Sequence, residues 1–274
     1  MAQDILAAPL GRQRLAGAAN GVALTTTAAF TGLIQGTRYV DLIPRNPATA
    51  VVARYIECPY LIVLKTADAL ATPPIDYSEM AQDGDTGTSV TLSELSTAAN
   101  NDFLYVGCAE QFRGVDIDVD AVNGTASVLT VRNWDGRSWA DVSDTDNTES
   151  GGASLAQDGT VTWTVPTVWV SESLRGIGDT PATVNFEYAT VPMYWTRWEW
   201  SAGVDAATTL DHMLAMNRST AYAETPVTLG QGFRVKHGSL GGISGYEALT
   251  DAGTANLLVV CSTLGDEFRA GVIK

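Results

Sequence analysis

Short strand-like segments separated by turn residues run through most of this sequence and constrain its fold more than any other feature. The 26 glycines include Asn-Gly, Asp-Gly and Gly-Gly pairs, which mark tight turns. Many short strands at regular spacing are typical of a β-sandwich or β-barrel, so we predict an all-β fold. The candidate strands are residues 22–28, 37–43, 49–57, 60–65, 103–107, 114–122, 126–134, 139–143, 160–165, 183–190, 193–200, 227–236 and 255–262.

Helical periodicity is scarce and limited to two short windows. These are residues 92–99, LSELSTAA, and residues 205–216, DAATTLDHMLAM. Both carry apolar residues three or four positions apart, which would place them on one face of a helix. We therefore expect two short helices in an otherwise β structure.

Charge and tryptophan content separate the middle of the chain from its flanks. Of the formal net charge of −15, residues 99–211 carry −12, whereas residues 1–98 carry −3 and residues 212–274 are neutral. All seven tryptophans lie between positions 134 and 200. The middle third is therefore predicted to be a domain of its own.

We predict two β domains and an N-terminal arm. Residues 98–217 form a β-sandwich that is inserted in, or follows, a smaller β-barrel or sandwich anchor domain made of residues 24–97 and 218–274. Residues 1–23 form the arm. Residues 5–40 contain no acidic residue, and their basic residues are Arg12, Arg14 and Arg38. One interpretation is a loosely ordered terminus, and the alternative is an extended arm that lies on another subunit.

The overall composition excludes several classes of partner. A strongly negative chain is a poor match for nucleic acid, because phosphate binding needs clustered Lys and Arg. No apolar run approaches the roughly 18 residues of a membrane span. The N-terminal residues lack the basic start and long apolar stretch of an export signal. We expect neither a nucleic-acid partner nor a membrane partner.

The three cysteines are widely spaced and form no Cys-x-x-Cys or Cys/His cluster, which argues against zinc. Cys58 and Cys261 lie in apolar runs, so we predict buried, reduced thiols. The alternative is a Cys58–Cys261 disulfide between the two flanks.

The sequence lacks a recognisable catalytic constellation. His212 and His237 stand outside any H-E-x-x-H or G-x-S-x-G motif, and the glycine-rich stretch GSLGGISG lacks the spacing of a phosphate-binding loop. A pair of glycosidase carboxylates among the many acids remains as the enzymatic alternative. We predict a non-enzymatic protein without a required cofactor.

The stretch VRNWDGRSWADV, residues 131–142, predicts a β-hairpin with a tryptophan on each side of its turn. A two-residue loop would pair Trp134 with the arginine of the turn, and a four-residue loop would pair Trp134 with Trp139. Because side chains alternate along a strand, both registers give the same two faces. The aliphatic face is predicted to be the core, and the other face carries Arg132, Trp134, Trp139 and Asp141.

The tryptophan face of the hairpin has two interpretations. A loop or a neighbouring subunit covering it is the one we predict, and a platform that stacks on a sugar is the alternative. In MYWTRWEW, residues 193–200, the same alternation places Trp195, Arg197 and Glu199 on one face. The opposite face carries Tyr194, Thr196, Trp198 and Trp200 and suits a sandwich core.

The stretch DIDVDAVNG aligns Asp116, Asp118 and Asp120 on one face of a strand. Three neighbouring carboxylates repel each other unless a cation or arginines lie nearby, so a calcium site is one hypothesis. The spacing is not that of an EF-hand loop. The simpler interpretation is a solvated strand face, and the same holds for the acidic loop at residues 143–152.

Five segments in the middle of the chain follow a recognisable order: Leu104–Gly107, Phe112–Gly114, Asn133–Trp139 with Val142, Leu155–Trp169 and Tyr194–Arg197. In these segments the chain resembles the jelly-roll-like β-sandwich modules of virion proteins from tailed bacteriophages. Their recurring pattern is a lyvG strand, an F.g strand, a YWnG..W..v hairpin, a L...G.v.w..P..W stretch and a closing YW.R strand. Asn133 departs from the aromatic residue that usually precedes the first hairpin tryptophan. The flanks show only a looser similarity, notably over residues 76–95.

The resemblance implies a non-enzymatic virion component that assembles in the host cytoplasm. A capsid decoration (cement) protein would bind the lattice of major capsid proteins, as a trimer or another cyclic oligomer. The flanking domain, with Arg12, Arg14 and Arg38, would then be the anchor, and the acidic module would face outward. The alternative is a tail, neck or fibre component that binds a host glycan through the tryptophan face. The expected partners are the major capsid protein or other virion proteins.

Overall fold

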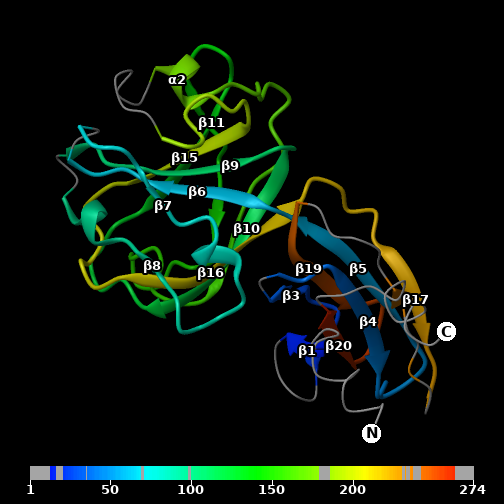
Figure 1. The fold of residues 1–274 in the computed structure, drawn as a ribbon. Coiled ribbons are helices and arrows are strands. Elements are labelled where there is room, and N and C mark those ends of the chain that lie inside the picture. The colour runs from blue at the N-terminus through cyan, green and yellow to red at the C-terminus, as the bar shows by residue number, and fades with distance from the viewer. Residues whose placement is uncertain are drawn as a thin grey trace, which may run out of the picture. The chain divides into compact units, whose positions relative to one another are not determined.

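The computed structural model has an almost entirely β architecture (Figure 1), with 48% of the residues in strands and 6% in helical segments. This confirms the predicted all-β fold. None of the helices in the described residues is long and apolar enough to cross a membrane. The structure describes residues 13–16, 21–34, 36–68, 71–97, 100–178, 186–229, 232, 235–236 and 242–262.

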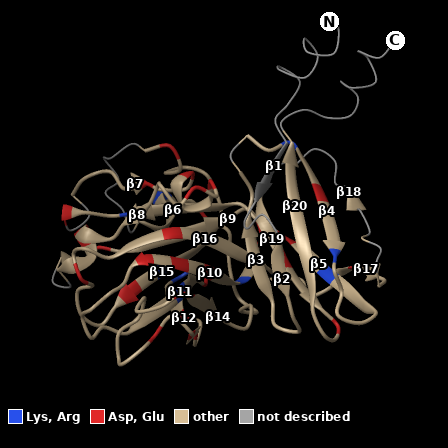
Figure 2. Cartoon of the chain, turned by 90° about the horizontal axis from the view of Figure 1, so that it is seen from below, with Lys and Arg blue, Asp and Glu red and all other residues tan. Residues whose placement is uncertain are grey.

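The chain divides into two compact units, one inserted in the other. Met1–Cys58 and Thr220–Lys274 form the flanking unit, and Pro59–Ser219 form the inserted unit. Within these bounds the inserted unit has 7 basic and 23 acidic residues, a net charge of −16, while the flanking unit has 9 and 8, a net charge of +1. The net negative charge of the chain therefore comes from the inserted unit, where Asp and Glu far outnumber Lys and Arg on strands and loops (Figure 2).

The inserted unit begins earlier in the chain than residue 98, where the sequence placed the boundary. Strand β6 (Leu61–Lys65) pairs with β9 (Leu104–Cys108), and β8 (Val90–Thr91) pairs with β16 (Thr209–Asn217). These backbone pairings attach residues 59–97 to the inserted unit. The change in composition near residue 98 therefore lies inside a unit, because strand pairing and not composition decides which segments pack together.

The flanking unit is a sandwich of two sheets. One has the order β1-β20-β4-β18 with β2 also on β20, and the other has the order β17-β5-β19-β3. Side chains of both sheets, among them Leu42, Val259, Tyr55 and Tyr246, form one buried core. The strands are β1 (Gln13–Ala16), β2 (Val22–Leu24), β3 (Ala29–Gly32), β4 (Tyr39–Arg45), β5 (Val51–Pro59), β17 (Ala223–Val227), β18 (Val235–Lys236), β19 (Ile243–Thr250) and β20 (Ala255–Ser262).

The described part of the predicted arm belongs to this sandwich. Strands β1 and β2 both pair with β20, so these residues extend a sheet of their own chain and are not an arm separate from it. Arg14 stands opposite Cys261 in the β1–β20 register, and Arg38 is exposed and donates its backbone N–H to Ser262. Arg12 lies outside the described residues. The anchoring role of the three arginines stays a prediction.

The inserted unit has a six-stranded sheet in the order β12-β11-β15-β9-β6-β7 and a five-stranded sheet in the order β13-β14-β10-β16-β8. The short helical segments are η2 (Met80–Gln82), η3 (Ser93–Ser96) and α2 (Leu174–Ile177). The remaining strands are β7 (Ile75–Asp76), β10 (Phe112–Ala121), β11 (Leu129–Trp134), β12 (Trp139–Asp141), β13 (Thr145–Asp146), β14 (Gly159–Thr162) and β15 (Tyr194–Trp200).

Eight of these strands have the connectivity of a jelly roll. The two four-stranded layers are β8-β16-β10-β14 and β9-β15-β11-β12, and the chain changes layer at almost every connection, except at the β11–β12 hairpin. Strands β6 and β7 widen one layer beside β9, and β13 widens the other beside β14. The predicted jelly-roll-like sandwich is confirmed for this unit.

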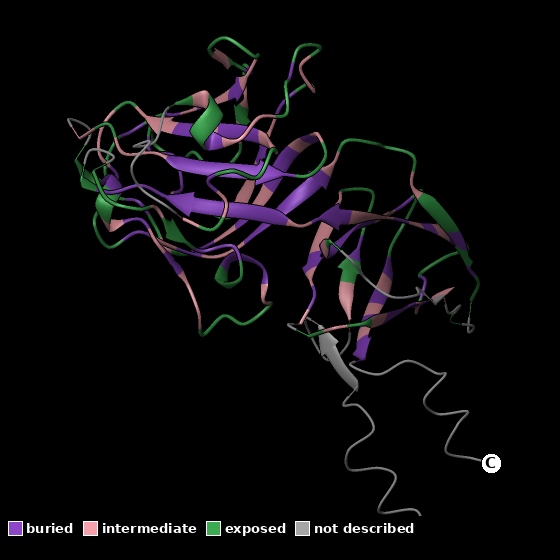
Figure 3. Ribbon diagram, turned by 45° about the horizontal axis from the view of Figure 1, so that its top comes forward, coloured by how far each residue is buried: buried purple, intermediate pink, exposed green. Residues whose placement is uncertain are grey.

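The core of the jelly roll lies between its two sheets (Figure 3). Val131 and Trp198 enter it from the six-stranded sheet, and Ile117 and Met213 enter it from the five-stranded sheet. Trp198 is buried, and its indole N–H donates to the Thr196 hydroxyl over 3.0 Å. A buried tryptophan needs such a partner for its one polar atom. The inward face predicted for residues 193–200 is therefore the core face.

A second apolar layer covers part of the outer face of the six-stranded sheet. It contains Ile62, Leu64, Tyr105 and Trp195, with Leu174 of helix α2 packed over them. For this reason every residue of β6 and β9 is buried. A Cβ atom on Gly107 would lie 2.5 Å from the Trp195 ring, so only glycine lets this indole lie against β9.

One of the two predicted helical segments contains a short helix, and the other is a strand. Residues 93–96 form the 3-10 helix η3, but residues 209–217 form strand β16 and not a helix. Leu210, Met213 and Leu214 have helical spacing, yet β16 pairs along almost the whole of β10. Tertiary pairing overrides such short periodic signals, which suit either structure.

All three cysteines are buried and free, so the alternative disulfide between Cys58 and Cys261 is not formed. Burial raises the pKa of the Cys108 thiol to about 11. The thiols are therefore part of the two cores, as predicted.

Candidate functional site

The hairpin adopts the register with the four-residue loop, in which Trp134 stands opposite Trp139. The Asp135 carboxylate accepts the backbone N–H groups of Ser138 and Arg137, both over 2.7 Å, and these bonds hold the pKa of Asp135 below its usual range. Gly136 has φ +96°, a left-handed conformation that favours glycine. The Asp-Gly pair thus closes the turn, and the turn fixes the register.

Alternation along β11 produces the two predicted faces. Leu129 and Val131 belong to the core between the sheets, and Val142 joins them there after β12. The side chains of Arg132 and Trp134 lie on the outer face. Asn133, which departs from the aromatic residue of the resembling modules, is buried and donates its side-chain amide to the Val168 carbonyl over 2.9 Å.

The two tryptophans form an edge-to-face pair on the outer face. Their ring centroids are 5.6 Å apart at an interplanar angle of 64°. Trp139 also contacts Tyr105, with centroids 5.9 Å apart, and packs against the outer apolar layer. Both indoles are half-buried. This pair is therefore partly covered from one side and open on the other.

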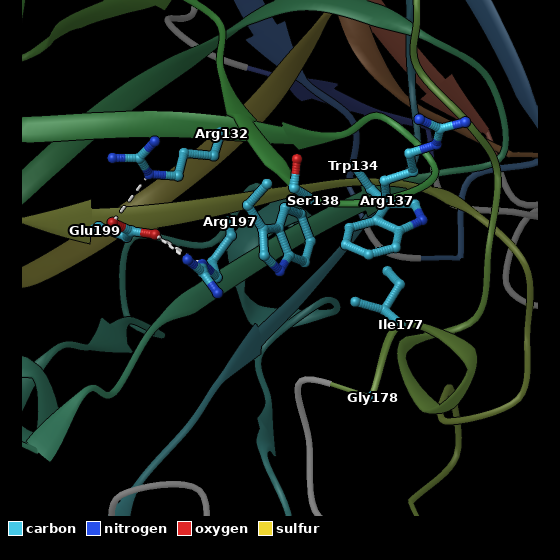
Figure 4. A pocket seen from close by; sticks show the side chains of 9 residues that line it. Arg132, Trp134, Arg137, Ser138, Ile177, Gly178, Arg197 and Glu199 are labelled. Atoms are coloured by element: carbon cyan, nitrogen blue, oxygen red, sulfur yellow. Dashed lines mark hydrogen bonds and ion pairs between the residues drawn. The ribbon is translucent and has the colours of Figure 1, made fainter.

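Two arginines lie beside this pair, bridged by one carboxylate. Arg132 and Arg197 stand directly opposite each other on β11 and β15. The Glu199 carboxylate accepts Nε of Arg132 at 3.1 Å through one oxygen and Nε of Arg197 at 2.8 Å through the other (Figure 4). The Arg197 guanidinium also lies 4.3 Å from the Phe103 ring centroid and 5.1 Å from that of Trp139. Glu199 thus relieves the repulsion between two like charges that the register brings together.

These side chains line an open pocket of about 510 Å³, which we call the Trp–Arg pocket. This volume falls within the usual range of small-molecule sites. Helix α2 closes one side through Ile177, and Ser173 caps the start of that helix by accepting the N–H of Gly176 over 3.0 Å. The lining residues are Arg132, Trp134, Arg137, Ser138, Trp139, Ile177, Gly178, Arg197 and Glu199.

The sequence predicted three of these lining residues as a set, namely Arg132, Trp134 and Trp139. Asp141, the fourth member of the predicted set, does not line the pocket; it stands opposite Arg132, and its carboxylate accepts the Ser143 N–H over 2.7 Å. Alternation along β15 had already placed Arg197 and Glu199 on one face. Their position beside β11 depends on strand order, which no local pattern contains.

The predicted row of carboxylates lies on the outer face of the other sheet. Asp116 and Asp118 flank His212 of β16, with Nε2 of His212 3.2 Å from Asp116 and Nδ1 3.6 Å from Asp118. Asp120 accepts the Thr209 hydroxyl over 2.9 Å. Each of the three carboxylates therefore has a partner on β16.

A β-bulge adds one further acidic group, Asp211, beside His212. Asp118 pairs with His212 but Val119 pairs with Leu210, so Asp211 is the extra residue. Burial opposes protonation of His212, but the hydrogen bond with Asp116 and the charges of Asp118 and Asp211 outweigh it, so the pKa of His212 is raised. Burial also raises the pKa of Asp118; the His212 charge opposes this rise.

The structure does not support the calcium hypothesis for Asp116, Asp118 and Asp120. Within the described ranges, no group of three or more His, Cys, Asp or Glu side chains is arranged to hold a metal ion. His212 lies between the first two of these carboxylates. His237 lies outside the described residues.

Comparison with known proteins identifies no relative. No protein-family model, no curated protein and no solved structure matches the chain.

Proposed function

We propose that this chain is a non-enzymatic structural protein of a tailed-bacteriophage virion, and specifically a capsid decoration protein that binds the lattice of major capsid proteins. The observation that carries the proposal is the insertion of an acidic jelly-roll unit into a separate β-sandwich of almost neutral charge. The resemblance of the inserted unit to virion modules adds to it.

The two units differ in net charge in a way that suits two different roles. The flanking unit has its own core and a net charge of +1, so its surface can approach a large protein lattice without strong repulsion. The inserted unit has a net charge of −16, which favours solvation of an outward-facing surface. In this proposal the flanking unit attaches the protein, as a trimer or another cyclic oligomer, and the inserted unit is displayed.

The copy number of the protein in purified particles tests this proposal. Quantitative mass spectrometry, scaled to the major capsid protein, should give a number of copies comparable with that of the capsid protein. A number far below it would contradict attachment to the head lattice. Particles that lack the chain entirely would contradict a virion role.

A second function is favoured by the Trp–Arg pocket. Two half-buried indoles beside an open volume of about 510 Å³ suit the apolar face of a sugar ring. In this second proposal the chain is a tail, neck or fibre component that binds a host glycan. Replacing Trp134 with Ala should abolish retention of the glycan without unfolding the unit, as measured on a glycan array and by circular dichroism.

A further inference from the structure

We propose that the Trp–Arg pocket binds an acidic saccharide, whose ring lies against the tryptophan pair and whose carboxylate is held by arginine side chains. The inference rests on the carbohydrate-binding function proposed above and adds the chemical class of the ligand. It does not depend on whether the protein lies on the head or on the tail.

The charge of the pocket is opposite to that of the unit that contains it. Three guanidinium groups and one carboxylate line the pocket, whereas the unit as a whole carries −16. Two further carboxylates of the hairpin, those of Asp135 and Asp141, accept backbone N–H groups of their own turns. Neither lines the pocket. Positive charge is thus concentrated where a small ligand would enter.

Glu199 does not use up the hydrogen-bonding capacity of Arg132. Across the described part of the chain, the Arg132 side chain makes one hydrogen bond, from Nε to Glu199, so its two terminal nitrogens remain available. The planar end of an arginine can donate two parallel hydrogen bonds to a carboxylate. Because Glu199 fixes Nε, the guanidinium plane is oriented before a ligand arrives, which lowers the entropy cost of binding.

Arg137 provides a second cation on the opposite side of the tryptophans (Figure 4). Its side chain is exposed, and in the described residues its one electrostatic partner is Asp135, whose carboxylate already accepts two backbone N–H groups. A ligand resting on Trp134 would therefore lie between Arg132 and Arg137. Such a position suits a molecule that combines an apolar ring face with a negative group.

An acidic sugar has both features. The C–H groups on one face of a pyranose ring can pack on an indole, and a uronic or sialic acid carries a carboxylate on the same ring. A neutral sugar would leave the arginine donors to water. Because Arg137 is exposed and Arg132 partly exposed, the binding should also depend on ionic strength, since salt screens charges at the surface.

The test uses the full chain on a glycan array that carries uronic- and sialic-acid-terminated glycans beside their neutral counterparts. Acidic glycans should be retained, and salt should weaken that retention. Arg137→Gln and Arg132→Gln should each reduce the affinity about tenfold, measured by calorimetry on the best acidic glycan. Arg113→Gln removes the same charge from β10, on the other sheet, and should leave the affinity unchanged.

The other possible results would each contradict a different part of the proposal. Equal retention of neutral glycans, lost only with Trp134→Ala, would overturn the acidic ligand and leave the carbohydrate function intact. Retention of no glycan would overturn both. Affinity that survives Arg132→Gln and Arg137→Gln would place the ligand elsewhere, and equal binding of a poly-glutamate peptide would overturn the saccharide. Arg137 is exposed, so its variant stays folded even if Arg132→Gln does not.

Discussion

On each outer face of the jelly-roll unit, two side chains of like charge lie close together with a side chain of opposite charge between them. On the six-stranded sheet, Arg132 and Arg197 stand opposite each other and share the carboxylate of Glu199. On the five-stranded sheet, Asp116 and Asp118 stand on either side of His212. In each case one residue of opposite sign lies between two like charges, which pairing between strands brings close for the arginines and alternation along one strand brings close for the aspartates.

The difference lies in how permanent the bridge is. On the six-stranded sheet, the face with Arg132, Arg197 and Glu199 (the arginine face), the bridge is a carboxylate that accepts a hydrogen bond from each guanidinium group. On the five-stranded sheet, the face with Asp116, Asp118 and His212 (the aspartate face), the bridge is a histidine whose charge depends on pH. The arginine face also has an apolar layer and a pocket beside it. The net charge of −16 is therefore a sum over two unlike faces of the unit, one with a basic patch and one that is acidic.

The largest expected effect is a loss of stability when a tryptophan is removed from the covered part of the arginine face, compared with its open part. Trp195 is completely buried, whereas Trp134 is half-buried at the pocket. Trp195→Ala should lower the free energy of unfolding by about 3–5 kcal/mol, because it leaves a large cavity. Trp134→Ala should cost roughly 1 kcal/mol, the value of an edge-to-face contact. Urea denaturation followed by circular dichroism measures both, and equal losses would contradict the division of this face.

The next largest effect is expected from a substitution that removes the bridge on the arginine face. Glu199→Gln removes the negative charge between Arg132 and Arg197 and should lower the free energy of unfolding by about 1–2 kcal/mol, since hydrogen bonds to charged groups are involved and the side chain is only 23% exposed. Chemical denaturation at low and high salt measures it. The loss should shrink at high salt, and a loss that is independent of salt would show that charge repulsion is not its cause.

The bridge on the aspartate face should break with pH. The pKa of His212 is raised in the folded protein, so its stabilising contribution is complete below the unfolded value of about 6.5 and is lost as pH rises through the folded value. His212→Gln should therefore cost about 1 kcal/mol near pH 6 and much less above pH 8. Thermal denaturation of both proteins across this range measures the difference. A difference that grows with pH would contradict the assignment.

The smallest effect concerns the end of the acidic row. Asp120 is exposed and accepts the Thr209 hydroxyl, a bond that an amide oxygen can also accept. Asp120→Asn should therefore change the free energy of unfolding by less than about 0.5 kcal/mol. Denaturation with urea at pH 7 checks this. A loss as large as that of Glu199→Gln would mean that the acidic face depends on all of its carboxylates.

Local patterns predicted which face each side chain occupies. Alternation placed Val131 in the core and Arg132 and Trp134 outside in either hairpin register, and it separated Trp198 from Arg197. These assignments were correct because the side-chain period of a strand is a property of neighbouring residues. The spacing of strands and turn residues predicted the all-β fold, and charge and tryptophan content predicted a separate acidic middle domain, with insertion as one of two possible arrangements.

Tertiary structure alone decided which strands became neighbours. It brought Arg197 and Glu199 beside Arg132, placed Ile177 at the edge of the pocket, and paired β6 with β9, which moved the unit boundary away from the change in composition. It also made a strand of residues 209–217, whose apolar spacing fitted a helix equally well. The physical reason is that backbone hydrogen bonds between strands join residues far apart in the chain, so strand order depends on the packing of the whole unit and not on any one segment.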